Sequence, residues 1–169
     1  MPTYALAFIY WLHLLATITW LGGMLILLFV VWPDLLRTYD DAPDQTRTLL
    51  DRIEDRFRPL ANLSLAVLLV TGLIQMGDDQ HYEGFLQLAN KWSIAMLLKH
   101  FVFIGMIAIT ATTQMIVLPG LKRATLLARH DESELTAEFD QRKKLRFLTT
   151  LNLGLGILVL LFTAVMTAL

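Results

Sequence analysis

Four long apolar stretches, separated by polar and charged segments, dominate the pattern of hydrophobic and polar positions along the chain. They extend from about residues 4 to 32, 60 to 77, 92 to 118 and 147 to 169. A helix needs about 20 mainly apolar residues to cross a bilayer core, since each residue adds about 1.5 Å to a thickness of about 30 Å. The pattern therefore predicts an all-α, integral membrane four-helix bundle that forms a single domain, 1–169, without a convincing internal repeat.

Prolines predict where three of these spans begin or end. Pro33 follows the first stretch and Pro119-Gly120 the third, and a proline cannot continue helical hydrogen bonding. Pro59 precedes the second stretch, and proline is favoured in the first turn of a helix. The polar segments "DQTRTLLDRIEDRF" and "DESELTAEFDQRKKLRF" also have helical features. We expect them to extend the spans or to lie on the membrane surface, rather than to dock a partner.

Composition supports the membrane class and excludes several kinds of site. Hydrophobic residues make up 56% of the chain and charged residues only 17%, whereas soluble domains average about 25% charged residues. A net charge of −1 gives no indication of nucleic-acid binding. The absence of cysteine excludes disulfides, thiolate metal sites and covalent haem attachment. The first apolar run lacks a preceding cation and a cleavage signal, so we expect a retained span.

The basic residues predict the orientation of the spans. Twelve of the 14 Lys and Arg residues lie in the two segments that join the first span to the second and the third to the fourth. Of the other two, Lys91 lies between the second and third spans and Lys99 lies inside the third. Since cytoplasmic loops are rich in Lys and Arg, we expect two basic cytoplasmic loops, with both termini and the 78–91 loop outside.

Three nitrogen-bearing side chains are predicted to share one depth in the membrane. At about 1.5 Å per residue, His13 lies about 14 Å from the outer end of the first span, and Lys99 and His100 lie about 10–12 Å from that of the third. Thr17 and Trp20 follow His13 at i+4 and i+7, on the same helix face. These five residues are the predicted cofactor-binding set.

A lysine at this depth needs an explanation. A charged lysine at the centre of a span costs about 2.5–3.5 kcal/mol. Lys99 could extend to the surface, and His100 could simply be hydrogen-bonded inside the bundle. A neutral imidazole or amine is, however, a ligand for haem iron, and helical bundles hold cofactors between facing helices. Because Lys99 and His100 are about 100° apart, only one of them would pair with His13, in a His/His or a His/Lys set.

Small and polar residues predict further contacts between spans. Gly22-Gly23 allows close packing against a neighbouring helix or a flat ligand. Thr71-Gly72 and Gln75 bring small and polar groups to the outer layer. Asn62 and Asn152, each near a cytoplasmic end, are expected to join helices or, less favourably, to contact a quinone or substrate.

The spans resemble a known membrane family. "WLHLLATITWLGGMLILLFVVWPDLLR", "RFRPLANLSLAVLLVTGLIQ" and "LLKHFVFIGMIAITATTQMIVLPGL" are similar to successive segments of the CopD-like copper-resistance membrane domain, over about residues 8–122. Its wider relatives include the HemJ-type protoporphyrinogen oxidases, in which a first-span histidine and a later lysine are implicated in b-haem ligation. The resemblance assigns those places to His13 and Lys99, and His100 stands where the family usually has an apolar residue. It also implies a prokaryotic cytoplasmic (inner) membrane.

Three functions from different classes follow from these observations. The leading hypothesis is a haem b protein with an electron-transfer or oxidoreductase role and a quinone or another membrane redox partner. The second is a copper-handling protein of transport or resistance, which would use His13, His81 or methionines. The third is a non-catalytic subunit or assembly factor of a larger membrane complex, acting in a homo- or hetero-oligomer within the lipid bilayer.

Overall fold

The computed structural model describes residues 1–33, 43–79, 91–128 and 135–168. Within these ranges the secondary structure is helical, without strands. Their segments long and apolar enough to cross a membrane are Thr3–Val31, Arg52–Asp78, Lys91–Ala128 and Leu135–Ala168. The predicted all-α fold with four membrane-spanning helices is confirmed.

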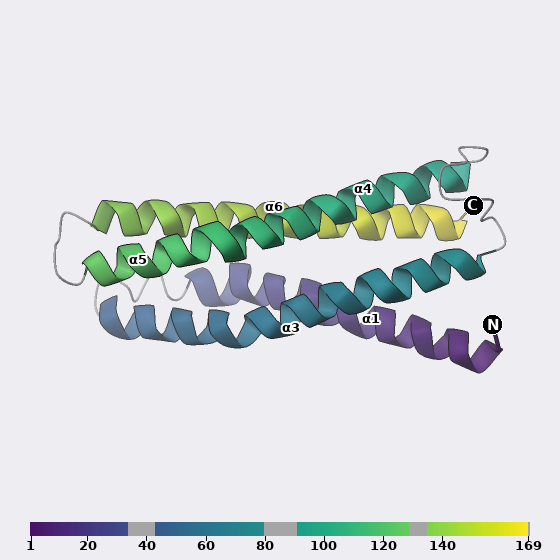
Figure 1. Ribbon diagram of the computed structural model, residues 1–169, viewed down its shortest axis with the longest axis horizontal. Helices are drawn as coiled ribbons and strands as arrows, with labels where there is room; N and C mark the ends of the chain where they lie inside the picture. Colours follow the sequence, from purple (N-terminus) through teal and green to yellow (C-terminus); the bar gives the residue numbers. More distant parts are fainter. Residues whose placement is uncertain (34–42, 80–90, 129–134, 169) are drawn as a thin grey trace. The chain divides into compact units, whose positions relative to one another are not determined.

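The chain divides into two compact units, Met1–Gln87 and Leu88–Leu169, and each is built on a helical hairpin. In the first hairpin, α1 (Thr3–Ile26) continues into a π-helical turn, η1 (Leu27–Val31), and packs against α3 (Pro43–Asp78), as Figure 1 shows.

Contacts at both ends of the first hairpin fix α1 and α3 as antiparallel. The ammonium of Met1 lies 3.0 Å from Oδ1 of Asp78, which ends α3. Further along α1, Gly23 faces the ring of Phe57, which occurs earlier in α3. Nothing lies within 4 Å of where a Cβ on Gly22 would be. Of the two glycines predicted to allow close packing, Gly23 is therefore the one that receives a neighbouring helix.

The second hairpin pairs a long interrupted helix with a long continuous one. Helix α4 (Lys91–Thr112) continues through a second π-helical turn, η2 (Thr113–Val117), into α5 (Leu118–Ala128). Helix α6 (Leu135–Ala168) packs against both α4 and α5 (Figure 1).

A side-chain hydrogen bond and a small residue join α4 to α6. Nδ2 of Asn152 donates to Oγ1 of Thr110 at 2.9 Å. A Cβ on Gly105 would lie 3.7 Å from Cδ1 of Leu155, so α6 lies close to α4 at this glycine. Asn152 therefore joins helices, as the sequence analysis expected.

Two of the predicted helix boundaries are wrong. Helix α3 begins at Pro43 and runs through Pro59, and the chain stays helical through Pro119-Gly120. Pro59 frees a backbone carbonyl beside the charged part of α3, where water can reach it. Before Pro119, η2 widens the hydrogen-bonding pattern, and π turns of this kind accommodate a proline inside a transmembrane helix. The described parts of the two polar segments, residues 44–57 and 135–147, thus continue the helices of the neighbouring spans, as expected.

The two hairpins share a repeated pattern that the sequence analysis did not find. Each π turn ends two residues before a proline, Val31 before Pro33 and Val117 before Pro119. The returning helix of each hairpin has an Arg-Phe pair followed by an Asn-Leu pair at the same spacing: Arg56-Phe57 with Asn62-Leu63, and Arg146-Phe147 with Asn152-Leu153. The two hairpins therefore share these spacings, although Asn62-Leu63 is exposed and Asn152-Leu153 is buried.

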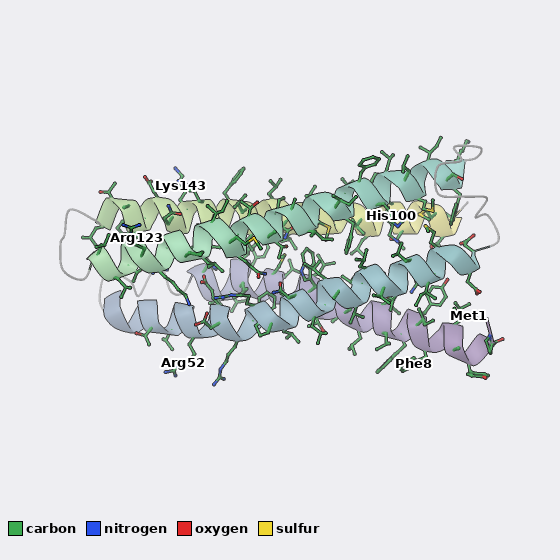
Figure 2. The ribbon with its side chains drawn as sticks, viewed as in Figure 1. Met1, Phe8, Arg52, His100, Arg123 and Lys143 are labelled. Atoms are coloured by element: carbon green, nitrogen blue, oxygen red, sulfur yellow. The ribbon has the colours of Figure 1, made fainter. Side chains whose placement is uncertain are left out.

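A buried ion pair lies in the basic segment that precedes the fourth apolar stretch. Nε and Nη2 of Arg142 donate to Oε1 of Glu138 at 2.9 and 2.7 Å, and Glu138 is fully buried. Arg123 and Lys143 lie toward the end of this hairpin opposite His100 (Figure 2). Basic residues thus gather at one end of the hairpin, and the predicted orientation in the membrane stays a prediction.

Replacing Gly23 tests the packing of the first hairpin. The Gly23→Ala substitution places a Cβ against the Phe57 ring, so we expect a lower melting temperature in detergent. Gly22→Ala is the matched control: it meets open space and removes a helical glycine, so the free energy of unfolding should rise by up to about 1 kcal/mol. Equal effects of both substitutions, or no rescue of Gly23→Ala by Phe57→Ala, would contradict the assigned contact.

Candidate functional site

A hydrogen bond between the helices of the first hairpin orients His13. Its ring Nδ1 lies 2.7 Å from Oγ1 of Thr71 on α3. The Thr71 hydroxyl donates its one hydrogen to the carbonyl of Val67 at 2.6 Å, so it accepts the hydrogen bond from Nδ1–H of His13. This arrangement places the ring proton on Nδ1 and the lone pair on Nε2, the tautomer in which a metal-ligating histidine is held by a partner.

Two further residues bound the His13 ring and its helix turn. A Cβ on Gly72 would lie 3.6 Å from Cε1 of the ring, so the imidazole lies against this glycine. The hydroxyl of Thr17 donates to the backbone carbonyl of His13 at 2.8 Å. Thr17 thus stabilises its own helix turn, and its predicted contact with a cofactor stays a prediction.

Trp20 is the most deeply buried large side chain of α1, with 1% of its surface exposed. Its indole Nε1 is buried without a hydrogen-bond acceptor among the residues that the structure describes. A buried N–H group without a partner is unusual and costs free energy. Trp20 therefore carries a buried donor that the described residues do not satisfy, and its predicted contact with a cofactor stays a prediction.

Lys99 lies on the buried face of α4. Met96, three residues before it, and Met106, seven residues after it, are each only 2% exposed. These positions share a helix face with Lys99. Lys99 thus lies on the more buried side of the helix and is itself half-buried.

His100 lies at the edge of that buried face. Its Nδ1 donates to the backbone carbonyl of Met96 at 2.8 Å, which holds the ring along its own helix. Ile104 and Ile107, at i+4 and i+7 from His100, are 61% and 39% exposed. His100 is itself half-buried, as Lys99 is, so the burial of the two side chains does not choose between the alternatives that the sequence analysis left open.

Lys99 and His13 lie at the same distance along the helix from the π turn that follows each of them. His13 lies 14 residues before Leu27, the first residue of η1, and Lys99 lies 14 residues before Thr113, the first residue of η2. Seven residues after each stands a side chain that is almost fully buried, Trp20 in the first hairpin and Met106 in the second. Each hairpin therefore carries one nitrogen-bearing side chain at the same distance from its π turn.

Some of the other predicted metal-binding residues lie outside the part of the chain that the structure describes. His81 lies in a segment that the structure does not describe, so the predicted copper contact there stays a prediction. Within the described ranges, no three His, Cys, Asp or Glu side chains gather as in a site for a bare metal ion. His13 belongs to the first compact unit, and Lys99 and His100 belong to the second. The predicted site that His13 shares with one of them therefore also stays a prediction.

Comparison with known proteins identifies the family. The family model for copper resistance protein D, CopD, matches residues 51–166, more than half of the chain. The chain belongs to the CopD family. No curated protein and no solved structure matches it. The CopD match covers Thr71, Lys99 and the fourth span, whereas His13 precedes it. This CopD protein is thus a multi-pass membrane protein whose family name refers to copper.

The sequence analysis placed Thr71 in the outer layer but did not assign its contact with His13. The i to i+4 spacing within a helix gives no information about which residue of another helix lies opposite. A threonine beside a glycine, at the depth of a histidine in another span, was the available signal.

Removal of the Thr71 hydroxyl should change the tautomer of His13. In Thr71→Val the ring loses the acceptor of its Nδ1–H, and a hydrogen bond of about 1 kcal/mol corresponds to about a fivefold change in the tautomer ratio. The ¹⁵N chemical shifts of labelled histidine measure this ratio in the purified protein. Thr17→Val, which removes only a bond to the His13 carbonyl, is the control. Unchanged shifts in Thr71→Val would contradict the assigned hydrogen bond.

Proposed function

We propose that this CopD-family protein is a b-type haem protein of the prokaryotic cytoplasmic membrane with an electron-transfer role. The observation that carries the proposal is the hydrogen bond from His13 Nδ1 to Thr71, which leaves the lone pair of the ring on Nε2. We infer that this atom is one axial ligand of the haem iron. A partner on the second ring nitrogen is what orients ligating histidines in metal sites.

The residues of the first hairpin fit a flat, largely apolar group. Gly72 has no side chain and so leaves room beside the imidazole of His13. Trp20 offers a large apolar surface, and its N–H group lacks an acceptor among the described residues. A haem supplies four nitrogen ligands of its own, so the protein needs to provide only one or two. Bound haem would supply reversible one-electron transfer, and the protein would set its ligands and exclude water.

Lys99 is the better supported second ligand. It lies on the buried face of α4 and occupies in the second hairpin the register of His13 in the first. An amine in an apolar environment is favoured in its neutral form, which is the form that binds a metal. His100 is half-buried like Lys99, but it does not share the register of His13, and its ring Nδ1 donates to the carbonyl of Met96. We therefore propose a His13/Lys99 ligand pair.

Electron exchange would require a partner in or on the membrane. The exposed large side chains of the spans are apolar, which is consistent with lipid around them. A lipid-soluble quinone or a membrane redox protein is the class of partner that such a protein can reach, and an oligomer would bring the haem of one copy near that of another.

A copper-handling role is the second candidate, and the family assignment favours it. Imidazole and thioether groups suit copper. Met24, Met96 and Met106 are buried in the spans and would supply thioether ligands, and His13 would supply an imidazole ligand. The described side chains form no group of three His, Cys, Asp or Glu residues, so a copper site would depend on methionine or on residues outside the described ranges.

Three single substitutions test the proposed ligands. In purified protein expressed with haem supplementation, His13→Ala should lose most of the haem absorption. Lys99→Ala should retain haem but change from a six-coordinate to a five-coordinate spectrum. His100→Ala should leave the spectrum of the wild type, because its ring is held along its own helix by the carbonyl of Met96. A change in His100→Ala with none in Lys99→Ala would assign the second ligand to His100, and no change in any variant would contradict the proposal.

A further inference from the structure

Two buried N–H groups without acceptors lie on either side of the His13–Thr71 pair in the first hairpin. They are Nε1 of Trp20 on α1 and Nε2 of Gln75 on α3, and neither has a hydrogen-bond partner within the described residues. A third buried donor of this hairpin without a partner among the described residues, Nε of Arg58, lies in the charged part of α3. Native proteins satisfy most buried donors, so the two donors that flank His13 and Thr71 indicate an acceptor that is not part of the described chain. The known hydrogen bonds of the site do not use either group.

The positions of these donors along the hairpin follow from helix geometry. Trp20 comes seven residues after His13, which is about 10 Å toward the π turn. Gln75 comes four residues after Thr71, which is about 6 Å in the opposite direction, toward the end of α3 at Asp78. The imidazole of His13 therefore lies between the two donors along the axis of the hairpin.

The two donors suit acceptors of different charge. Trp20 is 1% exposed and lies in the interior of the span, where an anionic acceptor would be costly. Gln75 lies within one turn of Asp78, whose carboxylate already forms an ion pair with the Met1 ammonium at the end of the hairpin. A carboxylate near Gln75 is close to water at the end of the span. The anionic acceptor therefore belongs at Gln75, and a neutral group belongs at Trp20.

We propose that the side-chain amide of Gln75 donates a hydrogen bond to a propionate carboxylate of the haem, and thereby fixes which edge of the porphyrin faces the Asp78 end of the hairpin. This inference rests on the proposed haem-binding function. A b-type haem carries both carboxylates on one edge, so a single donor at one end of the site selects one orientation. Gln75 is a positioning residue and not an iron ligand.

The test compares haem with its dimethyl ester in full-length purified protein. Gln75→Leu removes the amide at similar size, and Gln114→Leu makes the same change in the π turn of the second hairpin as a control. The readout is the rate at which bound haem transfers to a scavenging apoprotein. Because hydrogen bonds to charged groups are the stronger ones, Gln75→Leu should lose haem about tenfold faster than the wild type and than Gln114→Leu.

The ester distinguishes a contact with the carboxylate from a general loss of packing. With haem dimethyl ester, which lacks the charge, Gln75→Leu and the wild type should differ by no more than about threefold. Equal acceleration with both haems, or none with either, would overturn the role of Gln75. If wild-type protein takes up neither haem, the proposed function itself fails, and that result is separate from the comparison of variants.

Discussion

The hydrocarbon core of the bilayer offers no water, so each polar group within it must be satisfied inside the protein or have a use. This constraint accounts for the two π turns, which keep the chain helical up to Pro33 and past Pro119. It also accounts for the threonine hydroxyls that donate to their own helices, and for the bond from Asn152 to Thr110. Against this background, buried polar atoms without a partner among the described residues remain in both hairpins. In the first hairpin, the orphaned donor of Trp20 lies on the same helix as His13, whose ring is hydrogen-bonded to Thr71.

Length and hydrophobicity were sufficient to predict the four spans, because the thickness of the bilayer fixes both. The face shared by His13 and Trp20 was also predictable, since it follows from helical periodicity within one element. The ends expected at Pro59 and Pro119 were wrong, because a proline stops a helix only where the freed carbonyl has no other solution. The role of Thr71 could not be predicted, because it depends on the register between α1 and α3, which neither helix encodes alone.

The spacing of His13 and Lys99 to a π turn, which is the same in both hairpins, bears on the role of Lys99. From depth alone, Lys99 and His100 were alternatives, and the family resemblance favoured Lys99. In the structure both residues are half-buried, and Lys99 has the register of His13 relative to a π turn. The proposed ligand pair would account for a costly lysine in a span, because Lys99 would then have a use there.

The most direct test of the central claim is a joint measurement on one sample of the purified wild-type protein. Optical absorption and elemental analysis of iron and copper, after expression with haem supplementation, report cofactor and metal together. The account predicts a Soret band with α and β bands on reduction, iron in a fixed ratio to protein, and no stoichiometric copper. Stoichiometric copper without any haem absorption would contradict it and would support the copper-handling role instead.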